Sequence, residues 1–363
     1  MEKNIEIKNG TMKENKERIY YFDILKIISC IAVIFIHVTA PIMDNFNPND
    51  FGWKVGNFYD SASRFSVPIF IMISGALFLS KETIDIKKLY KKNILRLLVA
   101  YIFYTIFYAF WKYFVLNRGI RLVNIKEIME SAVLESHYHL WFLPIIICIY
   151  MSLPILTKIT NNSSRKEMKY TLLLFFIFII LKNAIKAFSY KYLDAIVDRF
   201  SMLIVADYTG YFLLGYYLNK YDISIKKRIV FYVLGIASFF ACFFGTYFYS
   251  VYSNQFMATF YSNFFITTFF ESIAMFLFMK NLISKVKINN IVSKVIINIS
   301  NASFGIYLVH VFSIDFFTIL LNPILNSINP ILSIPLIVIV SFINSLILTN
   351  IIKKIPIIGK FLT

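Results

Sequence analysis

The sequence predicts an all-α, polytopic membrane protein, and three observations support this. Of the 363 residues, 58% are apolar and only 16% are charged, and the mean hydropathy is +0.68. A membrane-spanning helix needs about 20 apolar residues, so this composition can supply about ten spans. Helices are expected because backbone groups in lipid must be satisfied within the segment, and the alternating pattern of a membrane barrel is absent. An ordinary soluble enzyme is excluded.

Hydropathy along the chain places ten spans between polar connections. The expected ranges are 20–40, 58–80, 93–115, 139–157, 170–188, 199–218, 229–248, 260–280, 296–317 and 331–352. We interpret residues 1–18 as a flexible tail, 19–353 as one transmembrane domain, and 354–363 as a short C-terminal tail. No clear small-residue cleavage site follows the first apolar run, so the first span is expected to be retained.

The basic residues predict the orientation of the chain. Lys and Arg number 37 against 20 Asp and Glu, a formal charge of +17 that in a soluble protein would suggest nucleic-acid binding. Here most of them lie in short connections, where they set orientation and meet anionic lipid instead. Twenty-five fall on the side of the membrane that carries both termini and nine on the other, so both termini are predicted to be cytoplasmic.

The three cysteines indicate neither a disulfide framework nor a metal centre. Cys30, Cys148 and Cys242 all lie within apolar runs, with no paired spacing and no neighbouring His ligand cluster. No metal is therefore expected.

Ionisable residues inside the spans are the main functional candidates, because each is costly there and persists mostly for function or pairing. Lys26 and His37 are eleven residues apart, which places them about 20° apart around a helix and ~16 Å apart along it. They therefore share one face of the first span. The alternative is that Lys26 pairs locally with Asp23 while His37 only caps a helix end at the interface.

The outer halves of other spans carry further candidates. Asp60 and Arg64 are four residues apart on one helix face; they form a surface ion pair, or Arg64 reaches an anionic group in an outward cavity. His139 and Trp141 open the fourth span, where an aromatic belt with hydrated histidines is the alternative.

Two candidates lie late in the chain. Glu271 falls near mid-membrane with no basic neighbour in its own helix, so it needs a partner from another helix, for which a histidine is the natural candidate. His310 lies in the outer half of the ninth span. All four histidines and Arg64 thus fall toward the outside, while Lys26, Lys92 and Arg96 form a basic cluster at the inner side.

Five segments together resemble the acyltransferase 3 family of ten-helix membrane acyltransferases. They are YYFDILK at 20–26 followed by His37, SVPIFIMISG at 66–75, KKNILR at 91–96, HLWFL at 139–143 and SFGIYLVH at 303–310. They occur in family order across most of the chain. The departure is Asn93, which stands where the family's RxxR motif has its first arginine, with Lys92 beside it as a substitute.

The resemblance implies an O-acyltransferase of the bacterial plasma membrane. Its expected donor is cytoplasmic acyl-CoA, with acetyl or succinyl as the acyl group. Its expected acceptor is a hydroxyl of a cell-envelope glycan or of the lipid-linked precursor of that glycan. His37 is then the first choice as base or nucleophile, with Glu271 fixing its tautomer or that of His310. Lys26, Lys92 and Arg96 are expected to hold the diphosphate of acetyl-CoA. Asp60, Arg64, His139 and Trp141 are expected to bind the acceptor. The alternative is a transporter or flippase of a lipid-linked glycan, and a third reading is a catalytically inactive scaffold.

Overall fold

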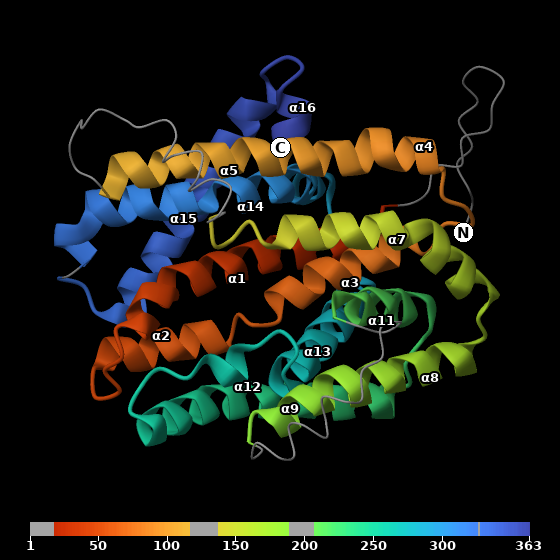
Figure 1. Cartoon of the computed structure of the whole chain (residues 1–363), viewed down its shortest axis with the longest axis horizontal. Coiled ribbons are helices and arrows are strands. Elements are labelled where there is room, and N and C mark those ends of the chain that lie inside the picture. Colours follow the sequence, from red (N-terminus) through yellow and green to blue (C-terminus); the bar gives the residue numbers. More distant parts are fainter. Residues whose placement is uncertain (1–17, 117–136, 189–206, 326) are drawn as a thin grey trace.

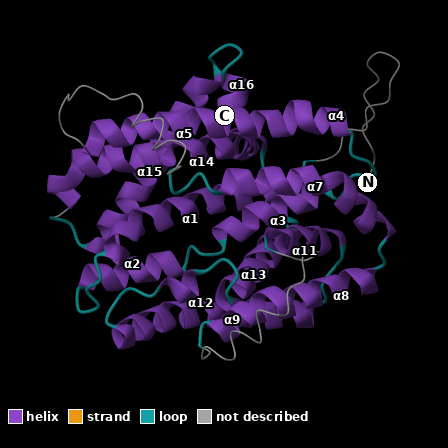
Figure 2. Cartoon of the chain, viewed as in Figure 1, coloured by secondary structure: helices purple, strands orange, loops and turns teal. Residues whose placement is uncertain are grey.

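The computed structural model describes residues 18–116, 137–188, 207–325 and 327–363. Within these ranges every regular element is helical (Figure 2). The longer elements are α1 (Tyr20–Asp44), α2 (Phe51–Ser61), α3 (Ser66–Phe78), α5 (Leu95–Leu116), α7 (Phe142–Asn162), α8 (Arg165–Phe175), α11 (Tyr208–Lys220), α12 (Ile225–Ser253), α13 (Ile266–Ile283), α14 (Asn290–Leu325) and α15 (Pro330–Lys353). The shorter ones are α4 (Ile86–Lys88), α9 (Lys182–Lys186), α16 (Gly359–Leu362), the π-helices η1 (Leu89–Ile94) and η2 (Phe176–Leu181), and the 3-10 helix η4 (Ala258–Tyr261).

The prediction of an all-α, multi-pass membrane protein is confirmed. Nine helical segments within the described ranges are long and apolar enough to cross a membrane. The remaining predicted span, 199–218, coincides in its described part with α11, whose 13 residues are roughly 20 Å long. Residues 199–206 lie outside the described residues, as does nearly all of the predicted N-terminal tail.

The second span differs from the single helix predicted for residues 58–80. It begins earlier, at Phe51, and is broken between α2 and α3. Pro68 favours the break: a proline ring clashes with the carbonyl four residues before it, here that of Arg64, whereas the first turn of a helix admits proline without loss of a hydrogen bond. The chain therefore starts a new helix at Ser66, and Arg64 is left in the connection, where it faces several elements.

Most helices run roughly along the long axis in Figure 1, and their connections gather at two ends. At one end, Asn161 of α7 donates hydrogen bonds to the carbonyls of Lys81 and Glu82, and Tyr21 of α1 donates to Asn219 of α11. At the other end, Tyr59 of α2 donates to the carbonyl of Ile331 in α15. These contacts join connections that the alternating topology assigns to the same side of the membrane.

α3 and α11 approach closely at two glycines. A Cβ atom on Gly75 would lie 1.9 Å from the carbonyl oxygen of Phe212, and one on Gly215 would lie 2.0 Å from that of Met72. Small residues permit such approach between membrane helices, whose association depends on van der Waals packing rather than on expulsion of water. The pair fixes the position of α3, which carries one wall of the site described below.

We expect Gly75→Ala to destabilise the bundle by about 1–3 kcal/mol, because the two backbones must separate to admit the methyl group. Thermal unfolding in detergent measures this. Gly56→Ala is the matched control, since the nearest atoms to its Cβ would be side-chain atoms, Ile42 Cγ2 at 3.3 Å and Met43 Sδ at 3.5 Å. Equal melting temperatures for the two variants would contradict the close α3–α11 contact.

Candidate active site

α1 carries the two residues whose spacing predicted a common face. Lys26 and His37 both line one cavity, so they do share a face of α1. Asp23 does not pair with Lys26: it accepts hydrogen bonds from Arg18 at 2.8 and 3.0 Å and from Ser300 of α14 at 2.6 Å. Asp23 forms no salt bridge with Lys26, although its charge acts on Lys26 electrostatically; its hydrogen-bond partners are Arg18 and Ser300. The ammonium group of Lys26 is left for the cavity.

The four histidines form one cluster built from three parts of the chain. The ring of His37 lies 5.0 Å from that of His310 and 6.3 Å from that of His139, measured between centroids. His137 joins His139 through a 3.0 Å contact between their Nδ1 atoms. Burial and the charge of Lys112 lower the pKa of His137 to about 4, so this ring is neutral at neutral pH.

His310 is held in one tautomer by its own helix. Its Nδ1 lies 2.6 Å from the carbonyl oxygen of Tyr307, which can only accept, so Nδ1 carries the proton. The Nε2 atom is then the unprotonated nitrogen, and it is buried with no hydrogen-bond partner among the described residues. The hydroxyl of Tyr307 in turn donates to the carbonyl of His139 at 2.5 Å, which ties α14 to the segment before α7.

A cavity of about 400 Å³, the narrow cavity, runs from the basic residues to the histidines. Lys26 and Arg96 line it together with His37, His139 and Trp141. Arg96 packs over the ring of Phe304 with 4.8 Å to the centroid and donates to the carbonyl oxygen of Thr363 beyond α16. Cations and imidazoles thus share one enclosed space between α1, α3, α5, α7 and α14.

A second cavity of about 980 Å³, the wide cavity, is also lined by His37. Its polar lining includes His137, Asp50 and Asp315, and the indole of Trp111 donates to Asp315 at 2.9 Å. The rest of its lining comes from α1, α2, α5, α14 and α15 and is largely apolar, although it also includes Lys112. His37 lines both cavities, and it is therefore positioned where contents of the two spaces can meet.

Asp60 and Arg64 form the ion pair that their spacing indicated. Arg64 also lies over the ring of Tyr261, 3.9 Å from its centroid, and close enough to His37 and Glu271 to interact with both electrostatically. Neither Asp60 nor Arg64 lines the narrow or the wide cavity. The pair stands beside the histidine cluster, at the break between α2 and α3.

Glu271 makes no direct hydrogen bond with His37 or His310, the two histidines expected to lie within reach of it directly or through one water. It is 7% exposed on α13, and both carboxylate oxygens lack a hydrogen-bond partner among the described residues. The charged group that acts on Glu271 electrostatically is Arg64, which lies at the break in the second span. The backbone carbonyl of Tyr307, not a carboxylate, fixes the tautomer of His310.

We expect Glu271→Gln and Arg64→Gln to be non-additive, with a coupling of about 0.5–3 kcal/mol, because they remove two ends of one electrostatic interaction. Thermal unfolding of the single and double variants measures the coupling. Glu271→Gln combined with His310→Gln is the comparison and should be additive within about 0.5 kcal/mol. Strong coupling to His310 and none to Arg64 would contradict this arrangement.

The basic motif of the third span is only partly in the site. Lys92 is exposed and does not line the narrow cavity, whereas Asn93 and Arg96 do. The π-helix η1, which covers 89–94, changes the helical register at this point, and π-turns are frequent at functional sites. Because the register decides which side chain faces inward, Asn93 rather than Lys92 accompanies Arg96.

Sequence reasoning missed the polar residues of the wide cavity. Asp315 is, like Glu271, an ionisable residue inside a predicted span, so the sequence alone could have identified it as a candidate. Trp111, Tyr138 and Tyr307 carried no such signal, since aromatic residues are common throughout this chain. Among the described residues, no group of three or more His, Cys, Asp or Glu side chains is arranged to hold a metal ion.

Comparison with known families identifies the family of the chain. A family model described as an acyltransferase domain, that of the acyltransferase 3 family, matches residues 19–350. The chain belongs to the acyltransferase 3 family. No curated protein and no solved structure matched the chain. The match makes this protein a multi-pass membrane acyltransferase and favours acyl transfer over the transport and scaffold alternatives.

The narrow cavity of this acyltransferase is lined by all five segments that carry the family resemblance. The contributing side chains are Lys26 from the first, Val67, Phe70, Ile73 and Ser74 from the second, Asn93 and Arg96 from the third, His139, Trp141 and Phe142 from the fourth, and Ser303, Phe304 and Tyr307 from the fifth. Segments up to 280 residues apart in sequence therefore meet around one space. This convergence supports the narrow cavity as the centre of the acyltransferase site.

Proposed function

We propose that the protein transfers an acyl group, acetyl in the first instance, from cytoplasmic acyl-CoA to a hydroxyl of a cell-envelope glycan or its lipid-linked precursor, as an O-acyltransferase of the bacterial plasma membrane. The observation that carries this proposal is the position of His37. It lines both the narrow cavity, which has a cationic end, and the wide cavity, which has carboxylates and an apolar wall. Donor and acceptor thus have separate spaces that share one imidazole.

The narrow cavity fits the donor. Arg and Lys side chains bind phosphate oxygens through charge-assisted hydrogen bonds, and Lys26 and Arg96 supply such donors at one end. His37 lies ~16 Å from Lys26 along α1, a length suited to the slender arm between the diphosphate and the thioester of coenzyme A. Lys26 and Arg96 hold the phosphates in this proposal, and the thioester reaches the histidine cluster.

The reaction requires removal of one proton. In the proposed step, His37 takes the proton of the acceptor hydroxyl while its oxygen attacks the thioester carbonyl. The carbon–sulfur bond breaks, the thiolate of coenzyme A leaves with a proton, and an ester remains on the acceptor. Arg64, held by Asp60 beside the histidine cluster but outside both cavities, contributes a positive potential that favours the negative charge developing on the carbonyl oxygen. Glu271 acts through Arg64 as a positioning residue.

His310 gives the same site a second imidazole. With Nδ1 committed to the carbonyl of Tyr307, its free Nε2 is suited to take up a proton or to receive the acyl group. Its ring centroid lies 5.0 Å from that of His37, so a proton can pass between the two through one bridging group. His139 and Trp141 then contact the reacting end of the donor from the α7 side.

The wide cavity fits a sugar acceptor attached to an apolar carrier. Asp50 and Asp315 accept hydrogen bonds from hydroxyl groups, and the ring of Trp111 offers a flat surface of the kind on which sugars stack. Apolar side chains of α14 and α15 face the same space and suit a hydrocarbon chain. Its volume lies at the upper end of the range of small-molecule sites.

The test is incubation of the purified protein in liposomes with radiolabelled acetyl-CoA and lipid-linked glycan. Label on the glycan, with release of free coenzyme A thiol, supports the proposal. Movement of the glycan across the bilayer without label would support a flippase instead. Mass spectrometry of envelope glycans from cells with and without the gene identifies the acceptor, and unchanged glycan acylation would overturn the glycan assignment.

A further inference from the structure

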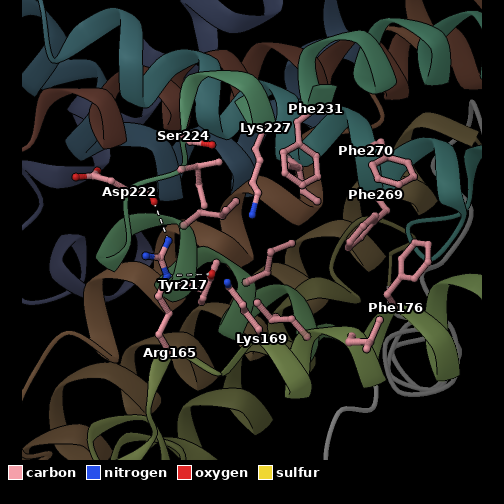
Figure 3. A pocket seen from close by; sticks show the side chains of 16 residues that line it. Arg165, Lys169, Phe176, Tyr217, Asp222, Ser224, Lys227, Phe231, Phe269 and Phe270 are labelled. Carbon is pink, nitrogen blue, oxygen red and sulfur yellow. Dashed lines mark hydrogen bonds between the residues drawn. The ribbon is translucent and has the colours of Figure 1, made fainter. Parts of the chain in front are cut away.

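A third cavity, the basic groove, lies away from the proposed active site and shares no residue with the narrow or wide cavity. It encloses about 600 Å³ between α8, η2, α11, α12 and α13 (Figure 3). Arg165, Lys169 and Lys227 form its rim, while its floor is apolar and includes the buried side chains of Leu214, Leu218 and Ile273. A cationic rim over an apolar trough is the arrangement that an amphiphile with an anionic head requires.

The three cations of the rim differ in whether they are already hydrogen-bonded to other residues of the protein. Arg165 donates to the carbonyl of Asp222 at 2.8 Å and, at 3.5 Å, to the hydroxyl of Tyr217. Lys169 and Lys227 make no hydrogen bond or ion pair with any described residue, and Figure 3 shows their ammonium ends pointing into the groove. The carboxylate on the rim, that of Asp222, pairs with Lys280 at 3.6 Å. Two cations are therefore available to a ligand.

The trough continues into the lipid-facing side of the bundle. The rings of Phe176, Phe269 and Phe270 line it beyond the cations, and Leu173 at its edge is 52% exposed. An acyl chain entering there would contact aromatic and aliphatic side chains while its head remains at the rim. Basic pockets between membrane helices at the cytoplasmic side bind anionic lipid heads, and the charge count assigns both rim segments, 158–169 and 220–228, to that side.

We propose that the basic groove binds one anionic phospholipid of the inner leaflet, with its phosphate between Lys169 and Lys227 and one acyl chain along the Phe176–Phe270 wall. The site is independent of the proposed acyl transfer, because its lining is separate from that of the active site. The lipid bridges α8 and α12, which both line the groove, and thereby stabilises this side of the bundle.

The test is native mass spectrometry of the delipidated full chain titrated with phosphatidylglycerol or with phosphatidylcholine of the same acyl chains. We expect one tightly bound phosphatidylglycerol and a preference of about tenfold or more over phosphatidylcholine, since each Lys near an anionic head contributes appreciably to binding. Lys169→Gln combined with Lys227→Gln should remove this preference. The matched control is Lys166→Gln with Lys226→Gln, exposed neighbours on the same two helices that do not line the groove.

Each other outcome overturns the proposal. Equal binding of both lipids by the unaltered chain, or an equal loss in the control variant, would mean that overall charge rather than the groove is responsible. Competition by glycerol 3-phosphate as strong as that by phosphatidylglycerol would show that the apolar trough is not used. Tighter binding of undecaprenyl phosphate than of phosphatidylglycerol would assign the groove to an isoprenoid carrier instead. Size-exclusion profiles and thermal unfolding confirm that each variant is folded.

Discussion

Replacement of His37 by alanine is expected to lower acyl transfer by about 10² to 10⁴, because a positioned general base or nucleophile typically contributes that much. Among the described residues, His37 is the side chain that lines both cavities. Insertion and folding should be retained, since removing a polar side chain from a span favours insertion. The measurement is label transfer from acetyl-CoA under single-turnover conditions.

His137→Ala is the matched control for this experiment. His137 belongs to the same histidine cluster but lines only the wide cavity. Its replacement should weaken acceptor binding while leaving the rate at saturating acceptor closer to that of the unaltered enzyme. Residual activity above about a tenth in the His37 variant would remove His37 from the role of base or nucleophile.

Lys26→Gln and Arg96→Gln are each expected to raise the KM for acyl-CoA by about 10- to 100-fold, which is the usual cost of one hydrogen bond to a charged group. The KM for the acceptor should change little, because neither residue lines the wide cavity. Steady-state kinetics with each substrate varied in turn measures both constants. Lys26 is the cleaner test, since Arg96 also contacts Thr363 and Phe304.

Lys92→Gln provides the control for the donor site. It removes the same charge from the same motif, yet its side chain is exposed and outside the narrow cavity. We expect no more than about a twofold change in the KM for acyl-CoA. A loss as large as that of the Arg96 variant would mean that the phosphates bind at the membrane surface rather than within the cavity.

The fold was largely predictable from the sequence because membrane spans depend on local composition. Runs of about 20 apolar residues predicted nine of the described spans within a few residues at most ends. The break in the second span was not predicted, although its cause, Pro68, was visible. A proline can kink, start or end a helix, and which of these occurs depends on the partners available to Arg64 and to the freed backbone groups.

The site was predictable to the extent that it follows helical periodicity. Lys26 and His37 share one face because eleven residues make nearly three turns. The charged group that acts on Glu271, and the absence of Lys92 from the lining of the narrow cavity, were not predictable in this way. The first depends on Arg64, more than 200 residues away in the chain, and the second on the register change of η1. Asp315 was predictable and was overlooked.

By itself, the sequence determined that this is a membrane protein, where its spans approximately lie, and which polar residues fall within them. Each of these depends on the free energy of transferring individual residues from water to hydrocarbon, which can be summed along the sequence. Only the tertiary structure decided that the histidines form one cluster, that His37 lines two cavities, and that Arg64 rather than a histidine interacts electrostatically with Glu271. These features depend on how helices distant in sequence pack. Packing is set by side-chain shape and close contacts such as those at Gly75 and Gly215, which hydropathy does not encode.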